Sequence, residues 1–440
     1  MQQYFNQLAA TATAALRQRE VFTAFVSGED SDFCRFNGAK VRQAGSVKQS
    51  KLELRLIDGR RNAQGELSLS GVRGEDEQRV LHMLGLLREQ LKQLPEDPYL
   101  LYATEVHSSE RRQISEIPDS AEVVSRIVDQ AKGVDLVGIY ASGSLYRGFA
   151  NSLGQRNWFE TANFNFDFSL YLRADKAVKT GYAGFAWDES EFAAKLATAK
   201  AQLAVLDQPV RSIAPGQYRV YLAPQALAEV AEMLSWGGFS LKAQKTKHTP
   251  LLKMIEGGVR MAPGVTMIED TAGGSAADFN DLGYTKPAQV KLIDAGVYRD
   301  ALISPRSAQE YGVATNGAGS DESPQSLSLA AGSLSDEQIL PTLGDGIYLN
   351  NLWYLNFSDR PAGRVTGMTR FASFWVDHGE IKQPLNVMRF DESILRLFGD
   401  KLVGLTSKRE LLPSSRTYGQ RSLEGVHLPG AVIDDFSLTL

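Results

Sequence analysis

Cysteine is almost absent from this sequence. Cys34 is the single cysteine in 440 residues. One cysteine cannot form an internal disulfide, and it cannot assemble a cysteine-rich zinc site. An isolated cysteine is typical of proteins from a reducing compartment. We therefore expect a cytoplasmic location.

A large excess of one charge and a long apolar run are also lacking. The chain carries 47 Lys and Arg against 52 Asp and Glu, a net charge of −5. Neutralising nucleic-acid phosphates requires a basic surface, so broad nucleic-acid binding is not expected. The basic stretch Lys242–Lys253 is more typical of a solvated face, and its role stays open. No stretch of about 18 apolar residues occurs, so no membrane span is expected.

Histidine pairs with metal-binding spacing are missing. The five histidines lie far apart: His82, His107, His248, His378 and His427. No two have the spacing of a helical HExxH or HExxxH pair. Asp377-His378-Gly379-Glu380 does place an imidazole beside two carboxylates. Because it lies between two strand-like runs and contains glycine, a hairpin turn is the better interpretation.

Other catalytic motifs are incomplete. There is no G-x-S-x-G elbow, and Ser142 has no base beside it in the sequence. The glycine-rich stretches 271–278 and 315–322 lack the Lys-Ser/Thr of a phosphate-binding loop, and flexible loops explain them. The sequence therefore has no complete catalytic motif and implies no cofactor.

The composition is that of a packed protein, with 43% apolar and 22% charged residues. Its length favours two domains. The stretch 206–217 has two prolines and a glycine and is the best boundary. We predict an α+β fold, with a mixed N-terminal α+β domain over 1–206 and a β-rich C-terminal domain over 217–440.

Periodicity predicts the elements of the first half. The N-terminus has the pattern of an amphipathic helix and not of a signal peptide. Strands are expected at 21–26, 51–57, 66–72 and 163–172, and helices at 75–94, 119–132 and 188–205. A polar stretch reaches about residue 50, and two strands should flank the Ser-Gly stretch 142–144. Along 163–172 every second residue is apolar, so the strand has one apolar and one polar face.

The second half is expected to consist mainly of short strands and hairpins. A strand at 218–224 leads into a helix to about 234. Strand-like runs at 290–296 and 297–303 form one hairpin, and another surrounds 377–380. Ser304-Pro305 is a helix start, and Ser335 with Gln338 is a capping box. The Gly- and Ser-rich region 313–334 should be a mobile loop.

Several segments resemble, in order, those of the TldD/PmbA family, also called modulators of DNA gyrase and classed with metallopeptidases. Each is short, and together they cover roughly residues 138–440. They are GIYASGSLYRGFANSLG (138–154), VKLIDAGVYRDALISPRSAQEYG (290–312), GDGIYLNNLW (344–353) with FWVDHGEIKQP (374–384), and LPGAVIDDFSLTL (428–440). The first 130 residues match only in outline.

The resemblance implies one of two kinds of chain. TldD-type chains resemble zinc peptidases, with ligands from an HExxxH helix and a cysteine near the C-terminus. PmbA (TldE) chains lack these residues and pair with a TldD-type chain. Here the His, Glu and His positions fall on Ser235, Trp236 and Ser240, and the cysteine position on Ser415. Serine and tryptophan do not replace two imidazoles and a general-base carboxylate.

We therefore expect a PmbA/TldE-type chain with no catalytic, cofactor-binding or metal-binding residues of its own. It would pair with a zinc-bearing TldD-type subunit and bind extended, unfolded peptide by strand addition. The alternatives are a free-standing hydrolase around His378 and Glu380 and, third, a DNA-associated regulator. The substrate, the existence of a partner and homodimerisation are left open.

Overall fold

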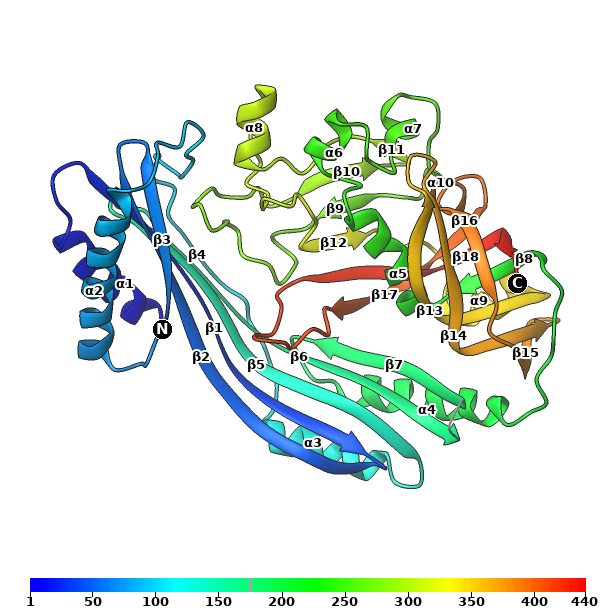
Figure 1. The fold of residues 1–440 in the computed structure, drawn as a ribbon. Helices are drawn as coiled ribbons and strands as arrows, with labels where there is room; N and C mark the ends of the chain where they lie inside the picture. The colour runs from blue at the N-terminus through cyan, green and yellow to red at the C-terminus, as the bar shows by residue number, and fades with distance from the viewer. Residues whose placement is uncertain (174–175) are drawn as a thin grey trace.

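The computed structural model describes residues 1–173 and 176–440. The first half of the chain forms one large sheet with helices, and the second half forms another (Figure 1). This arrangement confirms the α+β class, with a mixed N-terminal part followed by a β-rich C-terminal part. Of the helices in these described ranges, none is long and apolar enough to cross a membrane.

The first sheet is built from long, curved strands (Figure 1). Its strands are β1 (Glu20–Asn37), β2 (Lys40–Asp58), β3 (Arg61–Ser68), β4 (Ser109–Arg112), β5 (Asp135–Asn151), β6 (Arg156–Arg173) and β7 (Lys176–Gly184). Their order is β3-β2-β1-β5-β6-β4, and β7 pairs with β6. The pairs are antiparallel except β4 with β6.

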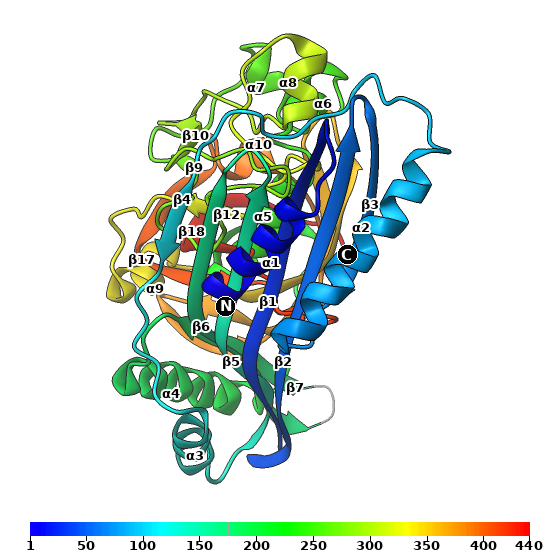
Figure 2. The same cartoon turned by 90° about the vertical axis from the view of Figure 1, so that its left-hand side faces the viewer.

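Helices cover one face of this sheet at both of its ends (Figure 2). They are α1 (Gln2–Ala14), α2 (Arg73–Leu91), α3 (Ser120–Gln130) and α4 (Glu189–Leu206). The even-numbered side chains of β1, β2, β5, β6 and β7 pack against them: Phe22 and Val26 against α1 and α2, and Phe166 and Phe168 against α3 and α4. Because side chains alternate along a strand, the odd-numbered residues of β1, β5 and β6 face the second half of the chain.

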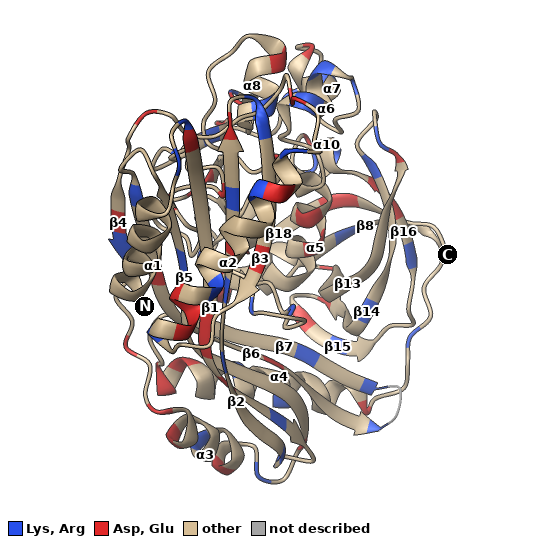
Figure 3. Ribbon diagram, turned by 60° about the vertical axis from the view of Figure 1, so that its left-hand side comes forward, with Lys and Arg blue, Asp and Glu red and all other residues tan. Residues whose placement is uncertain are grey.

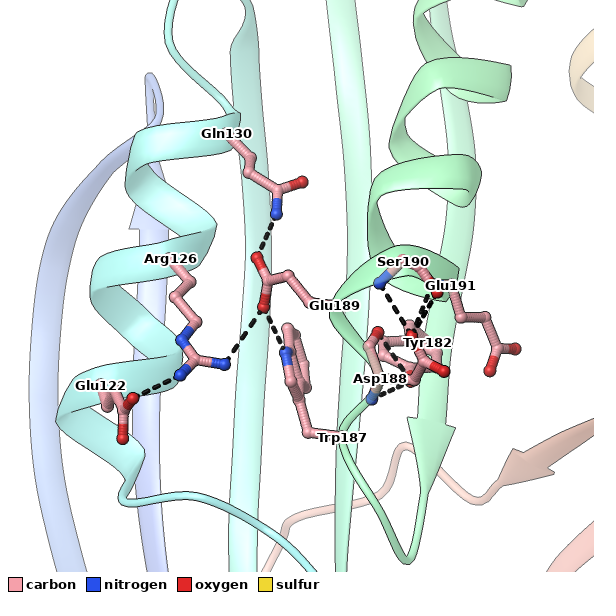
Figure 4. Close-up of polar contacts among 9 residues, drawn as sticks. All are labelled: Glu122, Arg126, Gln130, Tyr182, Trp187, Asp188, Glu189, Ser190 and Glu191. Atoms are coloured by element: carbon pink, nitrogen blue, oxygen red, sulfur yellow. Dashed lines mark hydrogen bonds and ion pairs between the residues drawn. The ribbon is translucent and has the colours of Figure 1, made fainter.

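Polar contacts join α3 to the start of α4 (Figure 4). The Glu189 carboxylate accepts hydrogen bonds from Trp187 Nε1 at 2.8 Å, from Arg126 at 3.3 Å and from Gln130. Asp188 caps α4 by accepting from the Ser190 and Glu191 backbone amides. Acidic groups are favourable at a helix N-terminus, so these contacts fix both helices under the sheet.

The second sheet contains eleven strands in the order β11-β10-β9-β12-β18-β16-β14-β13-β8, with β15 on β14 and β17 on β18. They are β8 (Gly216–Leu222), β9 (Met267–Glu269), β10 (Val290–Asp294), β11 (Val297–Tyr298), β12 (Ser326–Leu329), β13 (Gly346–Asp359), β14 (Arg364–Asp377), β15 (Glu380–Pro384), β16 (Arg389–Ser393), β17 (Leu402–Pro413) and β18 (Gly425–Leu438). The helices are α5 (Pro224–Ser235), α6 (Leu241–Lys245), α7 (Leu252–Ile255), α8 (Pro305–Tyr311), α9 (Asp336–Leu343) and α10 (Ile394–Leu397).

Helix α5 crosses this second sheet and carries part of its core. Leu227, Val230 and Leu234 lie fully buried in one cluster with β13 and β18 residues such as Leu349 and Ile433. Pro224 occupies the first turn, where a missing N–H costs no hydrogen bond. The helix therefore starts directly after β8 and packs against β13 and β18.

Several sequence predictions are confirmed. The four first-half helices form within a few residues of their expected bounds. Ser304 caps α8, and Ser335 and Gln338 make the predicted capping box of α9. The turn 377–380 joins β14 to β15 as a hairpin. The stretch 207–215 separates α4 from β8, and the domain limits 1–206 and 217–440 stay a prediction.

Several predictions were wrong in detail. The strands predicted at 21–26 and 51–57 are parts of the longer β1 and β2, which include the polar stretch between them. Lys40–Lys48 is exposed on both faces, so no alternation marks it. β5 runs without a break through 142–144. The strand expected at 297–303 is only Val297–Tyr298, and the loop 313–334 contains β12. β13, β14, β17 and β18 are also long, with 12 to 14 residues each.

Charged residues of both signs are interspersed over both halves (Figure 3). Within the basic stretch, Lys242, Lys245, Lys247 and Lys253 are exposed to solvent. Lys247 forms an ion pair with Glu256 at 3.5 Å. These lysines have the environment expected of a solvated face.

β5 continues past Ser142 because residue 143 is a glycine. Its φ is +131°, and an added Cβ would lie 2.2 Å from the Asp30 carbonyl oxygen of β1. Both the backbone conformation and the close approach exclude a side chain there. The close approach of β1 and β5 at this point thus requires glycine at residue 143.

We predict that Gly143→Ala lowers the free energy of unfolding by about 2–4 kcal/mol, through backbone strain and steric overlap. Urea denaturation measures the change. Gly45→Ala is the matched control, because a Cβ at Gly45 of β2 meets nothing within 4 Å. Equal midpoints for the two variants would contradict the proposed close approach.

Candidate functional site

A large cleft lies between the odd-numbered face of the first sheet and the second half of the chain. Its volume is about 740 Å³, within the range of ligand-binding pockets in proteins. Strands β1, β5, β6 and β7 form its floor. The segment 413–422, after β17, forms its roof.

The polar part of the cleft floor comes from β6. Asn163, Asn165, Asp167 and Ser169 all line it, and the phenylalanines between them face the helices. Asp167 forms an ion pair of 3.1 Å with Lys179 of β7. The polar face predicted from the sequence is therefore the floor of the candidate site.

The roof is held down by a buried arginine. Arg421 is 6% exposed. Its guanidinium donates to Asn163 O at 3.1 Å, to Gly143 O at 3.3 Å and to Ser31 Oγ at 3.4 Å, and also to the Asn163 side chain. It thus joins the segment 414–424 to β1, β5 and β6 at once.

Glu29 provides the opposite charge near this clamp. Its carboxylate, 1% exposed, accepts from Gln49 Nε2 at 2.6 Å and from the Arg421 amide at 3.4 Å. Burial lowers the pKa of Arg421 to about 10, and the nearby Glu29 charge opposes this effect. Arg421 therefore keeps its positive charge at neutral pH.

A smaller cavity of about 200 Å³ continues the cleft toward α5. The two share Asn165, Asp167, Lys179, Pro413 and Ser415. Helix α5 contributes Gln225, Ala228 and Glu229, which lie on one face at three- and four-residue spacing. Trp353, Phe371 and the end of β17 complete its wall.

Two strand edges meet at this smaller cavity. Gly181–Ala183 of β7 and Leu411–Pro413 of β17 both line it. In the described parts of the chain, β7 pairs with no named strand besides β6, and β17 with none besides β18. The other edge of β17 is bridged by Leu334 at Thr406, outside the residues that line the cavity. At the cavity, each strand thus has one edge without a partner strand. Such edges accept an added strand through backbone hydrogen bonds.

Glu229 is the unusual ionisable group of the site. Burial and, to a smaller extent, the Glu232 charge raise its pKa, the Lys179 charge lowers it, and the net pKa is about 7. No hydrogen bond or ion pair to its side chain occurs among the described residues. Glu229 therefore changes charge near neutral pH inside the cleft.

The structure does not bring the four expected vacated positions together. Ser415 lines both cavities, whereas Ser235, Trp236 and Ser240 line neither. Ser235 is the last residue of α5, and Trp236 is 57% exposed beneath Arg360. Ser240 caps α6 and donates to the buried Glu322 carboxylate at 2.6 Å. The assignment of the three helix positions stays a prediction.

The lining residues do not fit a zinc site. Zinc in proteins takes mainly Cys and His ligands with carboxylates as a supplement. Of the described residues around the two cavities, none is histidine or cysteine. The two carboxylates there are Asp167, paired with Lys179, and Glu229. We therefore assign no metal-dependent step to this cleft.

The turn at 377–380 lies away from both cavities. The His378 ring is 3.2 Å from Asp377 and 3.7 Å from Asp345, and these three groups have metal-ligand spacing. The His378 side chain is 87% exposed, and Glu380 is engaged by Lys382. Nothing at this turn encloses a substrate.

Sequence analysis missed Glu229, Lys179 and Arg421. Each is a single charged residue in an ordinary stretch, with no motif around it. The one usable signal was the polar face of 163–172, because it indicates where a second surface meets the sheet. Which residues complete that surface depends on contacts over long sequence distances.

Known proteins share the sequence pattern of the second half of the chain and the fold of the whole. Residues 215–440 match the sequence profile of the PmbA/TldA metallopeptidase C-terminal domain. A comparison with curated protein sequences finds no match. Solved structures match over 99% of this chain, at low identity, so they establish the fold alone.

Three of these solved structures are described by the following values. TldE from Thermococcus kodakarensis has a TM-score of 0.77, 14% identity and 100% of its chain covered. A proposed modulator of DNA gyrase from Thermotoga maritima has a TM-score of 0.73 and 15% identity, with 99% of its chain covered. Another proposed modulator of DNA gyrase, from Bacteroides thetaiotaomicron, has a TM-score of 0.71 and 13% identity, with 98% of its chain covered.

We predict that Arg421→Met lowers the free energy of unfolding by about 3 kcal/mol, because it breaks a buried, hydrogen-bonded charge cluster. It should also accelerate proteolytic cleavage within 414–424, measured by limited proteolysis and mass spectrometry. Arg416→Met is the control: its side chain is 75% exposed, pairs with Glu424 and donates to Ser414 Oγ at 3.4 Å. Equal cleavage rates in both variants would show that Arg421 does not hold the segment.

We also predict that Glu229→Gln stabilises the protein at pH 8 but not at pH 5. The fold disfavours the charged carboxylate, since the pKa rises from 4.5 in the unfolded chain to about 7. The free-energy cost of the ionised Glu229 in the folded chain is absent below pH 4.5, grows between pH 4.5 and 7, and reaches its full value above pH 7. Thermal melting of the variant, of Glu232→Gln and of the natural chain at both pH values measures it. A stability gain that is the same at both pH values would refute the assignment.

Proposed function

The chain belongs to the PmbA/TldD metallopeptidase family, and on this premise we propose that it is the non-catalytic, metal-free subunit of a TldD/TldE-type heteromeric protease. Its task is to hold an extended, unfolded peptide in the cleft between the two sheets. A zinc-bearing TldD-type chain supplies the hydrolytic site. The lone Cys34 suits a cytoplasmic, reducing location.

The observation that carries this proposal is a peptide-sized cleft without zinc ligands. Its floor is the polar face of β6, and the unpaired edges of β7 and β17 meet at its narrow end. An extended peptide satisfies its backbone groups by pairing with such an edge, and this mode depends little on sequence. The cleft therefore suits unfolded substrates of varied sequence.

The absence of histidine and cysteine from the described cavity linings supports a non-catalytic role. A zinc peptidase needs three protein ligands and a general base. A partner chain must then provide the chemistry. The similarity to TldE from Thermococcus kodakarensis agrees with this division of labour.

The alternatives gain less support. A hydrolase around His378 and Glu380 would need an enclosed substrate, and both residues lie on an exposed hairpin turn. A DNA-associated regulator would need a basic face. Acidic and basic residues are interspersed along the ribbon (Figure 3).

We predict that this chain copurifies with a coexpressed TldD-type chain and increases its cleavage of an unfolded peptide severalfold. Affinity pull-down and a fluorogenic peptide assay measure complex formation and cleavage. The TldD-type chain alone and this chain alone are the references. If no complex forms and the cleavage rate does not rise, the proposal is refuted.

The zinc content of the same preparations shows which chain carries the hydrolytic site. After chelator-free purification, this chain alone should contain far less than one zinc per chain, and the complex should contain the partner's zinc. Elemental analysis measures both. About one zinc per isolated chain, as in a closed protein site, would make this chain a peptidase itself.

A further inference from the structure

We propose that the smaller cavity is a cation subsite, in which the Glu229 carboxylate binds the ammonium or guanidinium group of a lysine or arginine in the bound peptide. This inference rests on the proposed peptide-binding function and specifies it. The cleft would then accept many sequences but prefer those that place a basic side chain beside α5.

The balance of charge in the cavity leaves one carboxylate open. Three charged residues line it: Asp167, Lys179 and Glu229. Lys179 and Asp167 neutralise one another at 3.1 Å. Glu229 has no hydrogen-bonding or ion-pairing partner in the described residues. A half-buried carboxylate without a partner is costly, and an incoming cation removes this cost.

The size and walls of the cavity suit a long side chain. At about 200 Å³ it is smaller than pockets that enclose whole ligands. Ala228, Leu411 and Leu412 line it with apolar surface, against which the methylene groups of lysine or arginine can pack. The carboxylate on α5 then meets the charged end. The edge strands beside it hold the peptide backbone.

Aromatic rings at the wall already accommodate a cation. The guanidinium of Arg370 lies 4.5 Å from the Trp353 ring centre and 5.2 Å from that of Phe371. Cations bind favourably over such rings. Arg370 is exposed, whereas the charges that influence Glu229 are those of Glu232 and Lys179. Arg370 therefore leaves the Glu229 carboxylate available.

The groups that face Glu229 determine how the subsite responds to pH. Glu232 comes from α5, Asp167 from β6 and Lys179 from β7, and the neighbouring Tyr182 side chain packs on the helix side of the sheet. With its pKa at about 7, Glu229 is ionised above neutral pH and neutral in acid. Preference for a basic side chain should therefore be strong at pH 8 and weak at pH 5.5.

The test compares two labelled ten-residue Ala/Ser peptides that differ at one central position, lysine or norleucine. A uniform host lets the peptide slide until that side chain reaches the cavity. Fluorescence anisotropy with the full chain measures both affinities at pH 8 and pH 5.5. We expect the lysine peptide to bind about tenfold tighter at pH 8, as for a hydrogen bond to a charged group. Most of this preference should disappear at pH 5.5.

Matched variants assign the effect to one residue. Glu229→Gln should bind both peptides equally at both pH values, and Glu232→Gln, on the exposed side of the same helix, should keep the preference. Equal affinities in the natural chain, or a preference that survives Glu229→Gln, would overturn the subsite and leave peptide binding intact. If neither peptide binds, the proposed function fails and the subsite with it.

Discussion

The structure depends on the alternation of side chains along the long strands of the first sheet. Even-numbered residues such as Phe22, Tyr140 and Phe166 bury one face under four helices. The same alternation turns Asn165 and Asp167 toward the second half of the chain. A shift of register by one residue would exchange the two faces. The apolar core and the polar cleft floor are therefore two results of one constraint.

The two halves are joined by an apolar contact and a charged one. Leu145, Phe149 and Phe159 of the first sheet cluster with Phe279 and Leu423 of the second half. Beside them, Arg421 spans three strands through its guanidinium. Apolar burial supplies attraction without direction, whereas the planar guanidinium requires one geometry. Together they position the roof of the cleft above the sheet.

The cleft lies beside two strand edges, and its described lining contains no histidine or cysteine. Its electrostatics are uneven, because Asp167 and Lys179 pair while Glu229 has no ion-pairing partner among the described residues. Charge left open in a partly desolvated site is usually functional rather than structural. In the proposed peptide-holding role, such a group would serve to select the peptide.

The sequence by itself determined the α+β class, most element positions and the polar face of β6. These features follow from local periodicity, caps and glycine or proline positions, which act over a few residues. The absence of an HExxxH motif and of a second cysteine is likewise a property of the sequence alone. Prediction from the sequence missed the exposed first part of β2, because a strand that buries neither face shows no alternation.

Only the tertiary structure decided which groups meet in the cleft. Glu229 and Asp167 are 62 residues apart, and Arg421 and Asn163 are 258 apart. Alternation tells which way a side chain points but not what faces it. The pKa of Glu229 likewise depends on burial against β13, β14 and β17. Desolvation and charge pairing arise between distant segments, so the site appears only when the two sheets pack together.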